Sequence, residues 1–354
     1  MAQPRGGRRI GQRRDRLRSY FRRNLPAYAL LLLAPSIPEL LTGSTPITEL
    51  VVNPIGFVVG FTLDIALYGA GALLIREFAV QFQKGWASIL LLGAAYGIAE
   101  EGFEVHTFFL PSGPPVNALG SYGHMFGVNW VWALALTVFH STYSIALPIL
   151  LTCLWFPQVK NARWLGRRTI TILACVFVGE VVIFGSLVGH GPTPDVLAFF
   201  VAVVALLVAL ALWAPRYLLS VRPGARSVSP RALGLLGAVE FVAYSLVLVF
   251  STTRAIPAVG AAIFLVLANA ATLYLVLRWV GTEDLERSEF YFAAGMMTAL
   301  FVWDVLIEFI GVPGILAVTA VFIYLLFRLN RTLNARHAAP RVPFGARGPP
   351  PVGT

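Results

Sequence analysis

Long apolar stretches recur along almost the whole chain, and short polar segments separate them. A helix needs about 20 residues to cross the hydrocarbon of a bilayer, because each residue adds about 1.5 Å along its axis. Most of the apolar stretches reach this length, so the pattern predicts membrane-spanning helices. We expect about ten spans, at residues 25–41, 54–75, 86–104, 129–156, 169–189, 195–215, 233–250, 257–279, 290–310 and 313–329.

The first predicted span differs from the others because it is short and contains Pro35 and Pro38. A proline inside a helix removes a backbone hydrogen-bond donor and bends or breaks the helix. We therefore expect a kinked helix or a re-entrant segment at this position.

Composition supports a membrane protein and excludes several other classes. Hydrophobic residues make up 57% of the chain and charged residues only 12%, whereas a soluble domain carries about 25% charged residues. A secreted disulfide scaffold, a disordered chain and an ordinary soluble enzyme are therefore excluded. The predicted fold class is all-α, a polytopic bundle of transmembrane helices.

Basic residues gather on one side of the predicted membrane. Of the 27 Lys and Arg residues, 26 fall in the terminal regions and loops on the side of the N-terminus, and only Arg254 falls on the other. Because cytoplasmic loops carry the excess of Lys and Arg, we expect both termini to be cytoplasmic and the chain to lie in the plasma membrane. This distribution also requires an even number of spans.

The net charge of +10 has a specific origin, because nine arginines lie in the first 23 residues. Such an arm is suited to anionic lipid head groups. No nucleic-acid-binding motif accompanies the charge, and no glycine-rich phosphate loop is present, so we expect neither nucleic acid nor nucleotide as a partner.

These features divide the chain into four regions. Residues 1–24 form a basic cytoplasmic arm, residues 25–189 a transmembrane core rich in polar residues, and residues 190–329 a second group of transmembrane helices. Residues 330–354, which are rich in Pro, Gly and Arg, are predicted to be a disordered cytoplasmic tail.

Acidic residues occur inside the predicted spans, where charge is costly and normally faces the protein interior or a wet cavity. They number about eight: Glu39, Asp64, Glu100, Glu101, Glu180, Glu240, Asp304 and Glu308. Most fall in the outer half of the membrane, so we expect a polar chamber that opens outward. A substrate or proton pathway would run along Glu39, Asp64, Glu104, Glu180 and Asp304. The alternative is a set of separate carboxyls that hydrogen-bond neighbouring helices and only hold the bundle together.

The strongest candidate for chemistry combines Glu100 and Glu101 with His140 on the next predicted span. Antiparallel neighbours with a short connection pack together, so one of the two carboxyls is expected to approach the His140 ring. A carboxylate beside a histidine can activate water as a general base. Glu and His side chains could instead hold a divalent metal, with His106 and His124 as further candidate ligands.

This arrangement resembles the CAAX-protease and bacteriocin-processing (CPBP) family of intramembrane proteases, which carries an EExxxR motif followed by FxxxH and HxxxN or HxxxD motifs. The resemblance implies that a Glu of the pair is the general base and that His140 stabilises the oxyanion. Val105 stands at the Arg position and Leu136 at the Phe position, and His190 is the candidate for the third motif.

A second resemblance runs from Pro38 to about Gly166. The stretches Pro38–Pro46, Gly71–Glu77 and Tyr96–Gly102 are similar to those of uncharacterised bacterial multi-pass proteins, which implies a bacterial origin and no particular activity. Three functions therefore stay open from the sequence: a CPBP-like intramembrane hydrolase, a proton-coupled permease, and a non-catalytic membrane scaffold.

Overall fold

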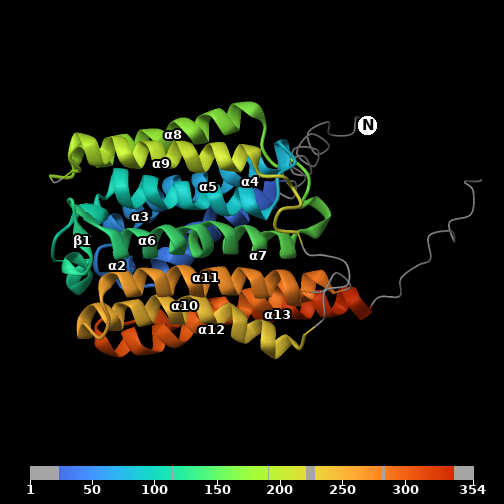
Figure 1. The fold of residues 1–354 in the computed structure, drawn as a ribbon. Helices are drawn as coiled ribbons and strands as arrows, with labels where there is room; N and C mark the ends of the chain where they lie inside the picture. Colours follow the sequence, from blue (N-terminus) through green and yellow to red (C-terminus); the bar gives the residue numbers. More distant parts are fainter. Residues whose placement is uncertain (1–23, 114, 190, 221–227, 281–283, 339–354) are drawn as a thin grey trace, which may run out of the picture.

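The computed structural model describes residues 24–113, 115–189, 191–220, 228–280 and 284–338. Within these residues the chain is a bundle of long helices that lie roughly parallel to one another (Figure 1). This confirms the predicted all-α class. The basic arm, residues 1–23, and the end of the tail, residues 339–354, lie outside the described residues, as does His190.

Eight helical segments among the described residues are long and apolar enough to cross a membrane. Two of them contain a π-helical turn: α3 (Pro54–Asp64), η2 (Ile65–Gly69) and α4 (Ala70–Gln81) form one, and α6 (Trp130–Phe139), η6 (His140–Ala146) and α7 (Leu147–Trp155) form the other. The remaining six are α8 (Arg167–Leu187), α9 (Pro194–Trp213), α10 (Pro230–Thr253), α11 (Ala258–Trp279), α12 (Leu285–Ile310) and α13 (Ile315–Ala338).

The other two predicted spans are also helical. Residues 24–35 form a helix that continues into the π-helix η1 (Ser36–Leu40), so the disturbance expected at Pro35 and Pro38 takes the form of a wider turn. The second segment consists of α5 (Trp86–Ile98) and the π-helix η3 (Ala99–Glu104). The first segment is short, and the second contains Glu100, Glu101 and Glu104, which lower its mean hydropathy.

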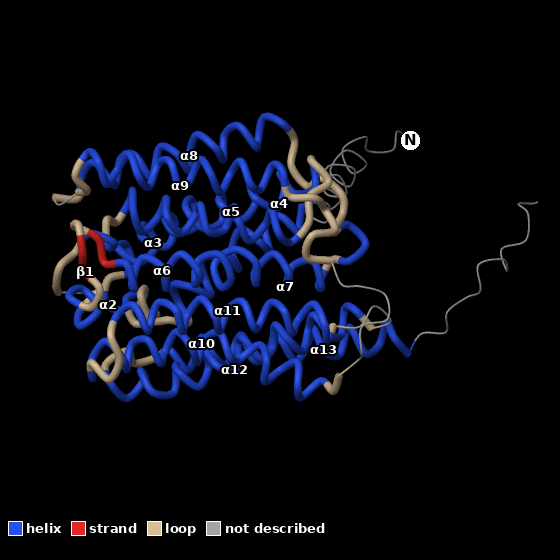
Figure 2. The backbone as a smooth tube through the Cα atoms, in the orientation of Figure 1, coloured by secondary structure: helices blue, strands red, loops and turns tan. Residues whose placement is uncertain are grey.

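Short elements connect the helices. The 105–129 loop contains η4 (Thr107–Phe109), η5 (Asn117–Ser121) and a two-stranded antiparallel ribbon of β1 (His124–Met125) and β2 (Val128–Asn129). Figure 2 shows this ribbon in red at the end of the bundle opposite the label N. Further short helices are α2 (Glu49–Val52) and η7 (Pro157–Val159).

Glycines bring α10 and α12 into unusually close contact. A Cβ atom at Gly295 would lie 1.9 Å from the carbonyl oxygen of Gly234, and one at Gly237 would lie 2.1 Å from that of Phe292. Side chains at these positions would therefore force the two backbones apart. Small residues serve helix packing in membranes in this way, because lipid provides no hydrophobic drive for helices to associate.

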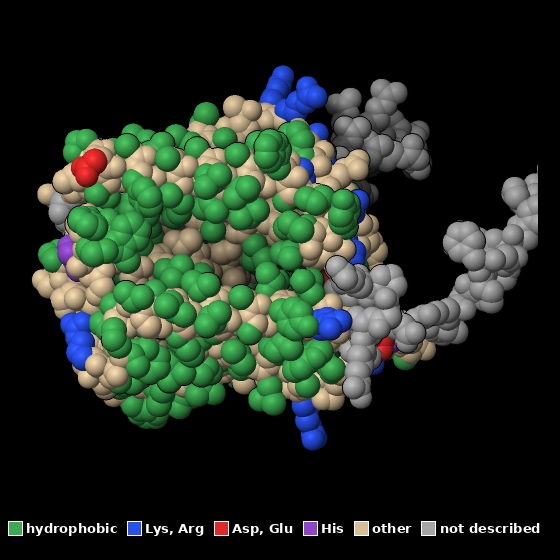
Figure 3. Space-filling model, viewed as in Figure 1, with side chains coloured by type: hydrophobic (Ala, Val, Ile, Leu, Met, Phe, Trp, Pro, Cys, Tyr) green, Lys and Arg blue, Asp and Glu red, His purple; other side chains and the backbone are tan. Residues whose placement is uncertain are grey.

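Helices of the two predicted transmembrane groups pack against each other, since α5 contacts α9, α6 contacts α11 and α7 contacts α12. The predicted division at residue 190 therefore does not coincide with a gap in the packing. The outer surfaces of the helices are largely apolar, and most Lys and Arg side chains in Figure 3 lie at the end of the bundle that carries the label N in Figure 1.

The last helix is longer than predicted. We expected disorder from residue 330, but α13 continues to Ala338. Leu329 and Leu333 are buried, and the Arg336 guanidinium donates to the carbonyl oxygens of Leu154 and Trp155 at 2.9 and 3.1 Å. The helix thus continues past the end of the apolar stretch of sequence, because its last turns contact α7 and not lipid.

Candidate functional site

Four π-helical turns occur among the described residues, and all four carry polar side chains that meet in one region of the bundle. They contribute Glu39 from η1, Tyr68 from η2, Glu100 and Glu101 from η3, and His140 from η6. A π-helical turn widens the helix by one residue and frees backbone groups, and such turns are frequent at functional sites. The coincidence of four of them marks this region as the candidate site.

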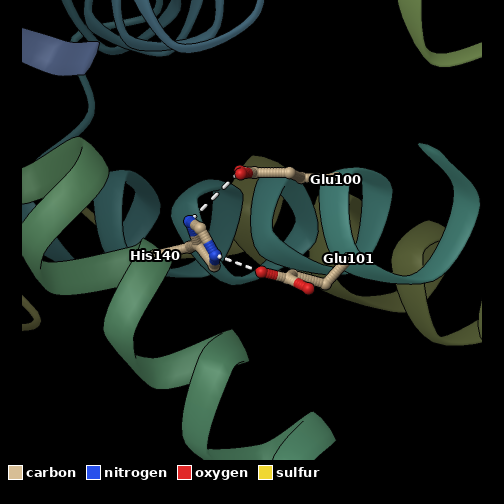
Figure 4. Close-up of side chains that lie close together, drawn as sticks. All are labelled: Glu100, Glu101 and His140. Carbon is tan, nitrogen blue, oxygen red and sulfur yellow. Dashed lines mark hydrogen bonds and ion pairs between the residues drawn. The ribbon is translucent and has the colours of Figure 1, made fainter. Parts of the chain in front are cut away.

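The His140 ring lies between the carboxyl groups of Glu100 and Glu101, as Figure 4 shows. Its Nε2 atom is 3.1 Å from Oε1 of Glu101, and its Nδ1 atom is 3.1 Å from Oε2 of Glu100. Nδ1 is also 3.0 Å from the Ser144 hydroxyl, one turn further along η6. We call Glu100, Glu101 and His140 the His140 cluster. Both carboxyls reach the ring, whereas the sequence pattern predicted one.

The His140 cluster is closed off from solvent. His140 is 3% exposed, Glu100 4% and Glu101 9%. Aromatic rings form its walls, with Tyr68 and Tyr96 each 6.1 Å from the His140 ring centre and Phe139 5.6 Å from it. An ionised group in such surroundings interacts strongly with its neighbours, because little water screens the charge.

On one side of the cluster, hydrogen bonds continue toward the first helix. The Tyr68 hydroxyl lies between Glu100 and Glu39 and contacts Oε1 of both, at 2.6 Å for Glu39. The Thr45 hydroxyl donates to the other Glu39 oxygen at 2.9 Å. A phenol has only one proton, so one of the two carboxyls has to carry a proton for both contacts to be hydrogen bonds.

On the other side, the cluster is bonded to the 105–129 loop. The Thr107 hydroxyl donates to Oε2 of Glu101, and the Trp132 indole N–H donates to the Thr107 oxygen at 2.9 Å. A continuous chain of polar contacts therefore runs from Thr45 through Tyr68, the cluster and Thr107 to Trp132. It connects four parts of the chain that are distant in the sequence, at residues 39–45, 68, 100–107 and 132–140.

Two glycines let α5 approach η6 closely enough to form these contacts. A Cβ atom at Gly97 would lie 2.9 Å from Cβ of His140, and one at Gly93 would lie 2.9 Å from Cα of Ser141. Real Cβ contacts are longer, so any side chain here would push the carboxyls of η3 away from the ring. The sequence Gly93-x-x-x-Gly97 is the small-x-x-x-small pattern of closely packed membrane helices.

A second group of acids lies beside the cluster and consists of Asp64, Glu104 and Glu180. Glu104 interacts electrostatically with the other two and with Glu100, and Asp64 interacts with Glu39. Each member of the group has one buried carboxyl oxygen without a hydrogen-bond partner among the described residues. Glu104 and Glu180 are buried, and Asp64 is half-buried.

Asp304 is fully buried but does not belong to either group. It accepts a hydrogen bond of 2.6 Å from Thr319, which joins α12 to α13. Glu240 similarly accepts from Thr142 and joins α10 to η6. Glu308 accepts from the backbone N–H groups of Gly314 and Leu316 at 2.9 and 3.1 Å, so it caps the start of α13. The contacts of these three carboxyls fit the alternative that such acids only hydrogen-bond neighbouring helices and hold the bundle together.

The two loop histidines are not part of the His140 cluster. His106 is buried with φ of 57° and packs 6.0 Å from the Phe109 ring. His124 is exposed in β1, and its Nδ1 atom contacts the Asn129 side chain. The His140 cluster is the group of potential metal ligands found among the described residues, and its ligand atoms lie within 4.8 Å of one another.

This geometry fits a proton-sharing site better than a metal site. Bonds of about 2.1 Å place two ligands of one ion at most about 4.2 Å apart, and about 3.4 Å apart in a tetrahedron. Glu100 and Glu101 face different ring nitrogens. One ion bound to either nitrogen would therefore reach only one of the carboxyls without movement of the other.

Several members of the site were not identified from the sequence. Tyr68, Thr107 and Ser144 complete the hydrogen bonds of the cluster, and Tyr96 forms part of its wall. A polar hydroxyl within an apolar span is a signal, because it has to find a partner when buried. The sequence does not indicate which partner a buried hydroxyl binds.

Comparison with known proteins places the chain in a family. No curated protein and no solved structure matches it. A family model described as an uncharacterized membrane protein family matches residues 29–339, which is most of the chain and includes the complete His140 cluster. The chain is therefore an integral membrane protein with several apolar helices, and it belongs to this uncharacterized membrane protein family.

Proposed function

We propose that the His140 cluster is the catalytic centre of an intramembrane hydrolase. The observation that carries the proposal is the position of the His140 ring, 3.1 Å from a carboxyl on each side and buried within the bundle. A histidine held between two carboxyls can receive and release protons without changing its position. General acid–base catalysis uses titratable groups within hydrogen-bond reach of the proton they move, and it contributes about 10²–10⁴-fold to a rate.

Different roles follow from the surroundings of the two carboxyls. Glu101 is the more exposed, at 9% against 4%, and it contacts the 105–129 loop through Thr107. We assign it as the general base that activates water. Glu101 takes a proton from water as the water oxygen bonds to the substrate carbonyl carbon, and protonated His140 donates a hydrogen bond to the carbonyl oxygen. When the C–N bond breaks, the proton held by Glu101 passes to the leaving amine nitrogen. Glu100, fixed by Tyr68, orients the ring from the opposite side.

Water and substrate would enter from the end of the bundle that carries the 105–129 loop. Thr107 is the loop residue closest to the chemistry, so displacement of this loop uncovers Glu101 first. We further propose ten spans, with both termini in the cytoplasm, which places this loop and its entrance on the outer side of the plasma membrane. In this proposal the outward-opening chamber forms only when the 105–129 loop is displaced.

The test uses purified full-length protein in detergent and a set of quenched-fluorescent peptides with an apolar transmembrane core. We expect cleavage by the unaltered protein and a loss of at least about 100-fold in Glu101→Gln, because Gln keeps the volume but cannot accept a proton. The matched control is Glu240→Gln, which changes an equally buried carboxyl that hydrogen-bonds Thr142 outside the cluster.

Cleavage that persists in Glu101→Gln, or that Glu240→Gln removes equally, contradicts the assignment. Addition of a chelator distinguishes this assignment from a metal-dependent site, because a site that works by proton transfer alone keeps its activity. Mass spectrometry of the products identifies the bond that is cleaved.

A second candidate is a proton-coupled permease, and the second group of acids favours it. Asp64, Glu104 and Glu180 carry unpartnered buried oxygens within the described part of the chain, next to the proton-sharing chain of Glu39, Tyr68 and Glu100. Proton relays in membranes use such residues. In proteoliposomes with an internal pH dye, Glu104→Gln and Glu180→Gln would slow proton entry if this candidate is right, and would leave peptide cleavage unchanged.

A further inference from the structure

A cleft lies between helices α5, α6 and α7 on one side and α11 and α12 on the other, and Ser141 and Thr142 of η6 line its inner part. It consists of two cavities, of about 390 and 880 Å³, which share the lining residues Trp86, Leu150, Leu219 and Glu289. Figure 3 shows a hollow on this face between the helices that Figure 1 labels α9 and α11. The volumes fall within the range of about 300–1,000 Å³ that is usual for ligand sites.

The two parts of the cleft differ in chemistry. The smaller cavity is lined mainly by apolar side chains of α5, α6, α7 and α11, such as Leu90, Leu147 and Val276, and it extends to the middle of the bundle at Thr142. The larger cavity lies at the end of the bundle where α4 and α7 end, and Lys84, Lys160 and Arg216 line it. Together they form an apolar channel with a basic mouth.

The charges at the mouth do not cancel within the described residues. Arg76, which also lines the cavity, pairs with Glu77, and Glu286 lies 3.9 Å from Arg336. This leaves Lys84, Lys160 and Arg216 opposite Glu289, which interacts electrostatically with Lys160. An excess of positive charge at the mouth favours an anionic group there.

We propose that the cleft binds one anionic glycerophospholipid, with its phosphate at Lys160 and Arg216 and one acyl chain in the apolar cavity. A free phosphate would use only the mouth, and an uncharged amphiphile only the channel. Trp86 lies where the two parts join, a position that suits an aromatic ring at the boundary between head groups and hydrocarbon. Lipid binding here does not depend on the proposed hydrolase activity.

The experiment measures lipid binding to the purified full-length protein by native mass spectrometry, with phosphatidylglycerol and phosphatidylcholine that carry identical acyl chains. We expect at least about tenfold tighter binding of phosphatidylglycerol, because both lipids carry a phosphate but the choline cation of phosphatidylcholine cancels its net charge and is repelled by the basic mouth. The double variant Lys160→Gln with Arg216→Gln should lose this preference. The control Arg167→Gln with Arg168→Gln removes two exposed charges at the start of α8 and should keep it.

A second pair of variants tests the channel. Ala270 lines the apolar cavity from α11, whereas its neighbour Ala271 is exposed on another face of the helix. Ala270→Trp should reduce the binding of both lipids by at least about tenfold, and Ala271→Trp should leave it unchanged. Circular dichroism verifies that each variant keeps its helical content.

Three results would overturn the proposal. They are equal binding of the two lipids by the unaltered protein, loss of the preference in the Arg167 and Arg168 control as well, and full lipid binding by Ala270→Trp. Inorganic phosphate tests whether the mouth binds a free phosphate ion and not a lipid. If it competes with phosphatidylglycerol at equal concentration, the mouth alone is the site. Failure of any of these tests leaves the Glu101 assignment untouched, because no cluster residue is altered.

Discussion

Thr107 donates a hydrogen bond to Glu101 and thereby ties the 105–129 loop to the buried His140 cluster. The Thr107 oxygen in turn accepts from the Trp132 indole. A loop residue and a membrane-embedded carboxyl are thus parts of one network. Movement of the loop changes the environment of Glu101 directly, without an intervening chain of packing contacts.

Replacement of Thr107 by Val should therefore expose Glu101 while it preserves the shape of the side chain. We expect faster modification of Glu101 by a membrane-permeant carbodiimide, measured by peptide mass spectrometry, and a stability loss of about 1–3 kcal/mol from the unpaired partners. Thr252→Val is the control, because Thr252 is exposed and bonds only a carbonyl of its own helix. Unchanged modification of Glu101 in Thr107→Val would show that the loop does not guard it.

Amide and apolar replacements at Glu100, Glu101 and His140 should separate chemistry from packing. Glu101→Gln keeps a side chain that hydrogen-bonds Thr107, so its melting temperature should stay close to that of the unaltered protein. Glu101→Leu leaves His140 and Thr107 without this partner and should cost about 1–3 kcal/mol. Thermal unfolding in detergent measures both. Equal destabilisation by Gln and Leu would favour the structural role and count against the catalytic one.

Gly97→Ala should displace His140 and thereby disturb the His140 cluster. The new Cβ atom would lie 2.9 Å from Cβ of His140, and overpacking of this kind costs about 1–3 kcal/mol. Gly179→Ala in α8 meets no atom within 4 Å and should be neutral or stabilising by about 0.5–1 kcal/mol, because Ala favours a helix. Melting temperatures of the two variants are compared. If Gly97→Ala is as stable as Gly179→Ala, the close approach of α5 and η6 is not required.

Reporter fusions test the proposed topology. Fusions after Arg167, Arg278 and the C-terminus should report a cytoplasmic location, and a fusion in the 105–129 loop should report an outer one, since Lys and Arg gather on one side. An outer location of the C-terminus would contradict the proposed ten spans. The outcome also decides on which side of the membrane the entrance to Glu101 would lie.

Much of the fold is readable from the sequence because membrane-spanning helices are local. Each apolar run satisfies its own backbone hydrogen bonds, so the runs at 169–189 and 195–215 alone predict α8 and α9 closely. The end of α13 was wrong by nine residues, because its continuation depends on contacts of Leu333 and Arg336 with other parts of the chain. Local patterns do not contain those contacts.

The sequence identified the main residues of the candidate site but not their arrangement. Glu100, Glu101 and His140 stand out because ionisable residues are costly in an apolar run, and composition alone reveals that cost. Their arrangement depends on where π-helical turns occur and on which helices are neighbours. Glu100 and Glu101 are consecutive in η3 and reach opposite nitrogens of the one ring that η6 places beside them, although consecutive residues of a regular helix point about 100° apart.

The sequence by itself determined the class of protein, the approximate helix positions and the residues that cannot face lipid, because each of these follows from the cost of burying polar groups in hydrocarbon. Only the tertiary structure decided which acids contact His140 and which, like Asp304, join two helices. It also decided that Tyr68 and Thr107 belong to the site. Hydrogen bonds act over about 3 Å, and no pattern along the chain specifies distances between helices to that precision.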